Sequence, residues 1–298
     1  MRLLTFMSLI ISVPVFSQTS MFRGSADHQA AVQMAANKLF GEEAWKYNAD
    51  APIRSSVAVA GNTVFFGTSR GEFIALDQKT GMVKWKYKSE HAVNSSPTCF
   101  NGKVFFADNQ QTLYALNAAT GRLVWKSSLG ESLHYEWAFD YFYSSPTISN
   151  NKIFIGSKDG NVYCINEADG KTTWKFKTTG IVRSTPAVKD GMLYVGSTEG
   201  ILYALNAQDG KEVWQFKIAG NAMKNEDFGF DRRAIISSPV IAGNKILVGG
   251  RDGFLYAVNK QSGKEEWRVD HEVSWVISSV AVKDSFVVTG TSDGRFVQ

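Results

Sequence analysis

The fold is decided by a stretch of eleven residues at 75–85, Ala-Leu-Asp-Gln-Lys-Thr-Gly-Met-Val-Lys-Trp. The same pattern of a small residue, an Asp or Asn, a Gly and a final Trp recurs at 115–125, 164–174, 204–214 and 257–267. A shorter copy ends at Trp45, so consecutive tryptophans are separated by 40, 40, 49, 40 and 53 residues. Three equal gaps indicate an internal repeat of about 40 residues, and the two longer gaps indicate insertions.

A second shared block precedes each full copy of the stretch. It begins with a Ser-Ser or Ser-Thr pair at positions 55, 95, 144, 184, 237 and 278, followed by Pro or Val. In one repeat, apolar runs at 185–188, 192–196, 202–206 and 211–216 are separated by short turns that contain Gly. Four short strands in about 40 residues, with no helix between them, predict a blade of an all-β propeller.

The repeated stretch combines a turn with a large aromatic side chain. The Asp or Asn and the Gly suit a tight turn between the third and fourth strands. We expect each Trp to lie on the outermost strand, with one face on the neighbouring blade and its indole N–H on a backbone carbonyl. Equal spacing favours this structural docking over ligand binding for Trp45, Trp85, Trp125, Trp174, Trp214 and Trp267.

The number of blades follows from counting strands. Complete repeats are predicted at 54–88, 94–126, 143–177, 183–217 and 236–269, and residues 276–298 supply the first three strands of another. Residues 41–47 supply a lone fourth strand in the same Gly-x-x-x-Trp frame. We therefore predict six four-stranded blades, closed by the N-terminal strand, which would remove an open sheet edge. The alternative is a fragment of a propeller with seven or eight blades.

The N-terminus has the features of an export signal. Residues 1–17 contain a basic start, an apolar run too short to span a membrane and a candidate cleavage site before Gln18. No Cys follows the run, so we expect an exported chain, periplasmic or secreted, that is not lipid-anchored. A membrane anchor is the alternative for this segment. The predicted organisation is a signal peptide at 1–17, a leader at 18–40 and the propeller at 41–298.

Composition excludes several function classes. The 298 residues are 44% hydrophobic, and 32 Lys and Arg against 28 Asp and Glu leave a net charge of +4. The charges are scattered, which argues against nucleic acid as a partner. The two cysteines, Cys99 and Cys164, occupy unlike positions of different repeats, so we expect buried free thiols rather than a disulfide. No later stretch is predicted to span a membrane, and we expect a monomer.

The repeated motif resembles the tryptophan-docking repeat of the pyrroloquinoline quinone (PQQ) family of propellers. This superfamily includes the quinoprotein alcohol dehydrogenases and the BamB-like outer-membrane assembly proteins. The resemblance covers residues 21–298 and implies the fold more strongly than the function. The chain lacks the Cys-Cys pair and any recognisable calcium site of the dehydrogenases, and its four histidines are dispersed. We therefore expect no catalytic residue and no cofactor, neither PQQ nor calcium.

The two insertions are candidates for a binding surface. They lie at 127–143 and 218–235, each before the first strand of a blade, so both are predicted on the same rim of the propeller. Recognition loops are commonly carried by rigid scaffolds. The alternative is that the two insertions cover each other as a structural cap. The candidate rim residues for a partner are His134, Trp137, Asp140, Tyr141, Phe228, Phe230, Arg232 and Arg233.

The residues that precede the serine pairs are predicted to surround the mouth of a central funnel. Of these, Arg54, Asn94 and Arg183 are the candidate funnel residues, because arginine binds carboxylate or carbonyl oxygens well. The alternative for the arginines is an ion pair with an acidic residue of an insertion.

The sequence leads to one preferred function and two alternatives. We expect an exported, non-catalytic propeller that binds a protein or another macromolecule at the insertion-bearing face, similar to BamB-type scaffolds. The alternatives are a PQQ-dependent or other oxidoreductase with its site in the funnel, and a carbohydrate-binding or sensor propeller. The identity of the ligand or partner does not follow from the residues.

Overall fold

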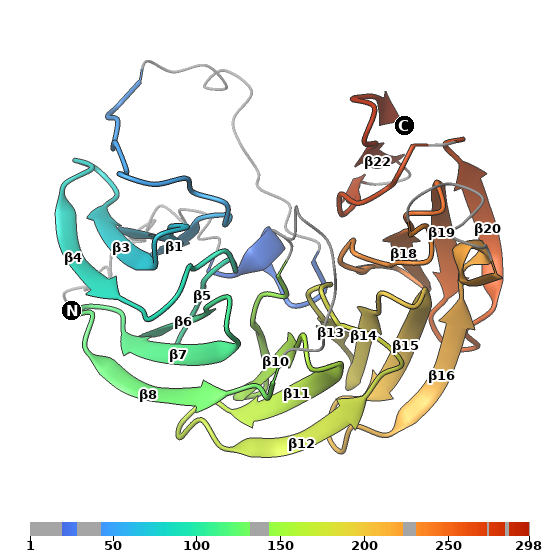
Figure 1. Cartoon of the computed structure of the whole chain (residues 1–298), viewed down its shortest axis with the longest axis horizontal. Coiled ribbons are helices and arrows are strands. Elements are labelled where there is room, and N and C mark those ends of the chain that lie inside the picture. Colours follow the sequence, from blue (N-terminus) through green and yellow to red (C-terminus); the bar gives the residue numbers. More distant parts are fainter. Residues whose placement is uncertain are drawn as a thin grey trace, which may run out of the picture.

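The computed structural model describes residues 20–28, 43–131, 143–222, 231–272, 274–283 and 286–297. Within these ranges it contains five four-stranded antiparallel sheets and one three-stranded sheet, each built from strands that are consecutive in the chain. The sheets are arranged around a common centre, with the first strand of each nearest the middle (Figure 1). The chain is therefore a β-propeller of six blades, as the repeat predicts.

The blades repeat the same strand lengths. Each has a first strand of three residues and a second of five, and blades 1–5 continue with two strands of six residues. Blade 1 contains β1 (Ala58–Ala60), β2 (Thr63–Gly67), β3 (Glu72–Asp77) and β4 (Val83–Lys88). Blade 2 contains β5 (Thr98–Phe100), β6 (Lys103–Ala107), β7 (Thr112–Asn117) and β8 (Leu123–Ser128). Blade 3 contains β9 (Thr147–Ser149), β10 (Lys152–Gly156), β11 (Asn161–Asn166) and β12 (Thr172–Lys177).

The remaining blades follow the same order. Blade 4 contains β13 (Ala187–Lys189), β14 (Met192–Gly196), β15 (Ile201–Asn206) and β16 (Glu212–Lys217). Blade 5 contains β17 (Val240–Ala242), β18 (Lys245–Gly249), β19 (Phe254–Asn259) and β20 (Glu265–Asp270). Blade 6 contains β21 (Ala281–Lys283), β22 (Phe286–Gly290) and β23 (Phe296–Val297). The short 3₁₀ helices η1 (Phe22–Gly24) and η3 (Ala219–Ala222) lie outside the blades.

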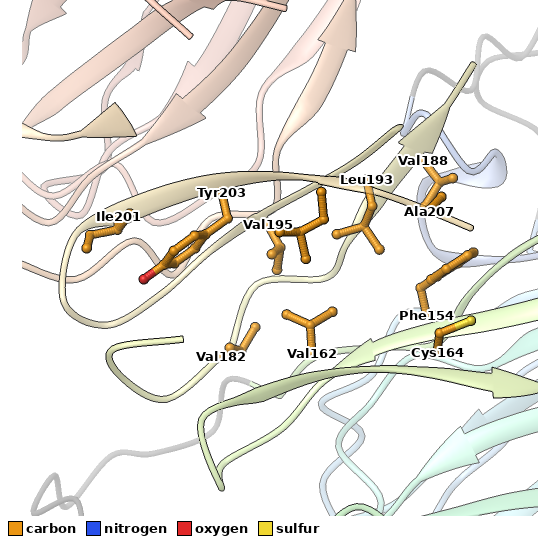
Figure 2. Packing of buried hydrophobic residues seen from close by; sticks show 11 residues of the cluster. Phe154, Val162, Cys164, Val182, Val188, Leu193, Val195, Ile201, Tyr203 and Ala207 are labelled. Atoms are coloured by element: carbon orange, nitrogen blue, oxygen red, sulfur yellow. The ribbon is translucent and has the colours of Figure 1, made fainter. Parts of the chain in front are cut away.

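The core of the propeller lies between blades. The second and third strands of blades 1–5 are buried on both faces, whereas the fourth strands alternate between exposed and half-buried residues. Figure 2 shows one such core, in which Phe154 and Val162 of blade 3 face Leu193 and Val195 of blade 4. Cys164 belongs to the same cluster, and both Cys164 and Cys99 are buried and free, as expected. Each of blades 2–6 therefore shares a hydrophobic core with the blade before it.

The repeated stretch forms the predicted turn. The carboxylate of Asp77 accepts hydrogen bonds from the backbone N–H groups of Lys79 and Thr80, each at 3.0 Å. Gly81 follows with a φ of +70°, a conformation that glycine adopts without a steric penalty. Ala75 of β3 pairs with Trp85 of β4, and the pairing register of these two strands shifts by one residue after Ala75. The same shift recurs between the third and fourth strands of the four other complete blades. The small residue and the Trp are therefore direct partners across β3 and β4.

Trp85, Trp125, Trp174 and Trp214 each lie against the turn of the following blade. The indole N–H of Trp85 donates to the carbonyl of Ala118 at 3.0 Å, and a Cβ built on Gly121 would lie 2.6 Å from the indole ring. Trp125, Trp174 and Trp214 make the equivalent bonds at 3.1–3.3 Å. Trp267 packs on the cluster between blades 5 and 6. That these contacts lock the blades together stays a prediction, which is tested below.

The N-terminal segment that the sequence predicts as a closing strand takes a different form. Residues 43–49 are not in a strand, although Trp45 donates to the carbonyl of Gln78 at 2.9 Å and so occupies the docking position on blade 1. Among the described residues, β23 pairs only with β22. In Figure 1 the segment that leads into β1 stands apart from blade 6. Closure of the last blade by this segment therefore stays a prediction.

Candidate functional site

The serine pairs have two separate structural roles at the centre of the propeller. The first serine of each pair bonds within its own blade; Ser95 Oγ, for example, accepts from the N–H of Ala107 and donates to its carbonyl, both at 2.8 Å. The second hydroxyl accepts a hydrogen bond of 2.9–3.0 Å from the backbone N–H of the preceding blade's second Ser or Thr. We call the six second residues the hydroxyl ring: Ser56, Ser96, Ser145, Thr185, Ser238 and Ser279. The sequence marked these pairs but did not indicate that they link the blades.

The hydroxyl ring surrounds a central cavity of about 220 Å³. The residues that precede the serine pairs also line it, so the structure brings the three candidate funnel residues Arg54, Asn94 and Arg183 to one cavity. Arg54 is exposed, whereas Asn94 is buried and the Arg183 side chain is only 3% exposed. Tyr143, Ile236 and Ile277 complete this outer layer of the cavity.

The leader forms the floor of the cavity. Phe22 lines it, and the segment 20–28 crosses the inner strands of several blades. Backbone carbonyls of the leader accept hydrogen bonds from Cys99 of β5, Val188 of β13 and Ile241 of β17. These inner strands would otherwise present unpaired N–H groups to the channel. The described part of the leader therefore crosses the channel beside the first strands of blades 2, 4 and 5.

Two side chains of the leader hold it in place. Arg23 Nη1 donates to the carbonyl of Ser279 at 2.9 Å, and Nη2 donates to the carbonyl of Val280, both in the segment that enters β21. His28 is buried, with Nδ1 2.7 Å from the carbonyl of Pro239. Burial lowers the pKa of His28 to about 4. The ring is therefore neutral near pH 7, and its Nδ1–H donates to that carbonyl.

Most of the candidate rim residues lie outside the described residues. These are His134, Trp137, Asp140, Tyr141, Phe228 and Phe230. The ends of both insertions are described, and they emerge at the links from a fourth strand to the next first strand. Lys158 Nζ lies 3.1 Å from the hydroxyl of Tyr143 and 4.5 Å from its ring centroid, just after the first insertion.

The two arginines of the second insertion differ in position. Arg233 is half-buried at the surface and forms ion pairs with Glu199 at 3.2 Å and Asp231 at 3.3 Å. Arg232, which the sequence suggested for the rim, is buried and donates to the carbonyl of Asp252 at 2.6 Å. The Asp252 carboxylate accepts from the N–H of Gly220 at 2.9 Å, and burial raises its pKa. Both ends of the insertion are thus anchored to blade 5, and Arg232 belongs to the protein interior.

Neither a metal centre nor a membrane span is found in the part of the chain that the structure describes. Within it, no group of three or more His, Cys, Asp or Glu side chains could hold a metal ion. Of the helices in the same ranges, none is long and apolar enough to cross a membrane. The expectation that the chain needs no cofactor stays a prediction.

Sequence comparison identifies a family. A family profile described as "Outer membrane protein assembly factor BamB" matches residues 30–136, 111–227 and 222–298. Together these matches extend over the whole propeller. A search of curated protein sequences found no significant match.

Solved structures with the same fold come from proteins of different activities. BamB from Moraxella catarrhalis is 21% identical with a TM-score of 0.56, and the match covers 85% of this chain and 86% of that one. The quinohemoprotein alcohol dehydrogenase ADHIIG from Pseudomonas putida is 16% identical with a TM-score of 0.69, over 87% of this chain and 48% of that one. A europium-containing methanol dehydrogenase is 15% identical with a TM-score of 0.70, over 85% and 58%. The chain thus spans about half the length of these dehydrogenases, and at such identities the likeness shows the fold alone.

Proposed function

The chain belongs to the family of the outer membrane protein assembly factor BamB, and from this premise we propose that it is an exported, non-catalytic scaffold that binds a protein partner. The family match across residues 30–298 is the observation that carries the proposal. The partner class would be a protein involved in outer membrane assembly, and the location periplasmic or secreted. The signal-peptide pattern at 1–17 supports export.

The insertion-bearing face is the proposed contact surface. Both insertions leave the same rim, and the second is anchored at its two ends through Gly220 and Arg232. Anchored loops on a rigid scaffold suit recognition, because little of the scaffold has to become ordered on binding. The aromatic residues Trp137, Tyr141, Phe228 and Phe230 of the insertions are of the kinds enriched in interfaces.

The proposal is tested by shortening the insertions. One variant replaces residues 132–142 by two glycines, which gives a link as short as that at 89–94, and another replaces residues 223–230 by two glycines. We expect both variants to melt near the wild-type temperature, because loop length contributes only about 0.6 kcal/mol per doubling. We expect both to lose partner capture after chemical cross-linking in a periplasmic extract, with the captured protein identified by mass spectrometry.

The matched control changes the opposite face. Charge-reversing substitutions at Lys79 and Arg122, in the turns between third and fourth strands, should leave capture intact. Capture that survives both loop replacements but fails in this control would move the contact surface to the opposite face. Unfolding of both loop variants would instead mean that the insertions are a structural cap.

Reconstitution with PQQ and calcium distinguishes the oxidoreductase alternative from the proposed scaffold function. The chain would be mixed with PQQ and calcium, desalted, and measured by absorbance and native mass spectrometry. A scaffold of the proposed kind retains neither. Stoichiometric retention of PQQ would replace the proposed function by that of a cofactor-dependent enzyme.

A further inference from the structure

The outer edges of blades 1 and 2 combine exposed aliphatic side chains with an excess of basic ones, a pair of features that the scaffold function does not use. We propose that this edge binds the surface of an anionic lipid bilayer. The outer patch consists of Lys79, Met82, Val83, Arg122, Leu123 and Val124. The proposal does not rest on the proposed partner surface, because the turns between third and fourth strands lie on the face opposite to the insertions.

The apolar part of the outer patch is continuous across one blade junction. Its four aliphatic side chains are 44–70% exposed, and they are four of the ten large hydrophobic side chains exposed in the described ranges. A Cβ built on Gly121 would lie 2.6 Å from the ring of Trp85, so the residues after this glycine and those before this tryptophan lie side by side. Figure 1 shows β4 and β8 consecutive along the outer circumference. Exposed apolar side chains gathered in one place mark a contact surface.

Basic side chains outnumber acidic ones at the same edge. The third and fourth strands of blades 1 and 2 with their turns, residues 72–88 and 112–128, contain six Lys or Arg and two Asp or Glu. The equivalent residues 201–217 and 254–270 of blades 4 and 5 contain five of each kind. The outer edge of the propeller therefore carries net positive charge on blades 1 and 2 and none on blades 4 and 5.

Part of this positive charge is not neutralised locally. Three of the lysines lie 2.7–3.8 Å from a carboxylate, and one of these carboxylates, Glu90, follows the counted residues. Including Glu90 still leaves a net charge of +3 at this edge. Lys79 and Arg122 are exposed, and within the described ranges neither side chain is at ion-pair distance from an Asp or Glu. Both can therefore approach an anionic surface at little cost.

Protection of the sheet edge does not account for the outer patch. Lysines on an edge strand oppose unwanted strand pairing, which would explain the basic residues alone. The same need exists on every blade, yet the two residues before the docking tryptophan are Leu123 and Val124 in blade 2 and Glu265 and Glu266 in blade 5. Exposed aliphatic side chains on an edge strand favour association rather than prevent it.

The residue types favour a lipid surface over a protein partner. Hot spots of protein interfaces are enriched in Trp, Tyr and Arg, with Leu and Val under-represented, and Lys is depleted in interfaces. The outer patch contains Met, Val, Leu and Lys, which suit the boundary between lipid headgroups and acyl chains. Aliphatic side chains enter this boundary, and the basic residues beside them are attracted to anionic headgroups.

The test places a reporter in the outer patch of the full chain. Met82→Cys is labelled with an environment-sensitive nitrobenzoxadiazole probe, and Val213→Cys, on the equivalent strand β16 of blade 4, is the matched control. Both positions are exposed, whereas the native Cys99 and Cys164 are buried and should not react. With vesicles of equal parts phosphatidylcholine and phosphatidylglycerol, we expect a blue shift of the probe at 82 and none at 213. Phosphatidylcholine vesicles or high salt should abolish the shift, because the attraction is electrostatic.

Substitutions in the patch then measure its contribution to vesicle affinity. Arg122→Glu should weaken binding at least about fivefold, the effect of losing one basic residue near an anionic surface. Lys211→Glu, at the equivalent position of blade 4, makes the same charge change and should bind as the wild type does. Leu123→Ser should weaken binding severalfold, and because both patch residues are exposed, these variants should melt as the wild type does.

Four outcomes would overturn the proposal. These are no shift of the probe at 82, an equal shift at 213, equal binding to vesicles without phosphatidylglycerol, and equal affinities of Arg122→Glu and Lys211→Glu. A shift of the probe at 82 that follows protein concentration in the absence of vesicles would also overturn it, because the outer patch would then be a contact between two copies of the chain.

Discussion

Five junctions between blades differ from the sixth, which would join blade 6 to blade 1. At each of the five, a ring hydroxyl accepts a backbone N–H of the preceding blade. At the sixth, no bond between Ser56 Oγ and blade 6 is present among the described residues. Val288 of β22 is 36% exposed, whereas Phe65 and Leu247, which pair with the equivalent first-strand residues, are 1% exposed.

The difference shows where the stability of a blade comes from. The first two strands of blade 6 have the same lengths as those of the other blades, but β22 has one buried residue of five whereas β2 has four. Its side toward blade 5 is packed, because Val280, Val282 and Val287 join the cluster of that blade. The hydrophobic residues of a blade are therefore fully buried only when a neighbouring blade packs on each side of it, as in other repeat architectures. The leader adds a further tie, because Arg23 bonds to two carbonyls of blade 6.

The largest expected effect compares a tryptophan of a complete junction with the one at the open junction. Trp214→Ala removes the ring that contacts Gly263 and the bond to the carbonyl of Lys260. We expect it to lower the free energy of unfolding by about 3–5 kcal/mol. Trp45→Ala also removes a ring that contacts Gly81, but it should cost less, about 2 kcal/mol, because residues 43–49 are not held in a sheet.

Urea unfolding of both variants measures the difference, and Trp214→Phe serves as the control that keeps an aromatic ring. Equal losses in Trp214→Ala and Trp45→Ala would mean that the sixth junction is as tight as the others. Near-wild-type stability of Trp214→Ala would refute the docking role itself.

The next effect concerns the leader and depends on pH. The pKa of His28 is lowered from 6.5 to about 4 by burial, so protonation favours release of the leader. Neutral His28 stabilises the bound leader fully above about pH 6.5. This stabilisation, about 3 kcal/mol, is lost as the pH falls through about 4. The hydrogen-exchange protection factors at Cys99, Val188 and Ile241, whose N–H groups bond to the leader, should decrease in this range once the intrinsic pH dependence of exchange is divided out.

The control for this prediction is His91→Gln, because His91 is exposed. The acid-dependent loss of protection should persist in that variant and disappear in His28→Gln. Protection factors at the three N–H groups that stay constant between pH 7 and 4 in the wild type would show that the leader does not respond to this histidine.

The smallest effect probes closure directly. Ser238→Ala removes the acceptor for the N–H of Thr185 and leaves a buried donor unpaired, which should cost about 1–3 kcal/mol. Ser56→Ala removes a hydroxyl that accepts no bond from the described residues of blade 6, so its cost should be within about 0.5 kcal/mol. If thermal unfolding shows the two costs to be equal, the ring is closed in solution, and residues 41–47 complete blade 6 as the sequence predicts.

The family, the strands and the blade count were accessible from residue patterns because they depend on local order. A Gly four positions before a Trp, repeated every 40 residues, specifies a turn and a strand wherever it occurs. The same periodicity placed Arg54, Asn94 and Arg183 at one depth, since each precedes a serine pair.

Other properties depend on residues that are distant in sequence, and only the tertiary structure decided them. The leader was recognisable as a segment, but its path across the channel rests on bonds to β5, β13 and β17, far along the chain. Arginine is usually a surface residue, yet Arg232 is buried because a turn of blade 5 provides the carbonyl of Asp252 as its hydrogen-bond acceptor. The serine pairs could be found in the sequence. Their hydrogen bonds between blades form only because the circular arrangement places each second hydroxyl beside a backbone N–H of the preceding blade. The sequence period determines the strands and turns within each repeat. Contacts between repeats depend on how neighbouring blades are placed around the ring, which the period does not specify.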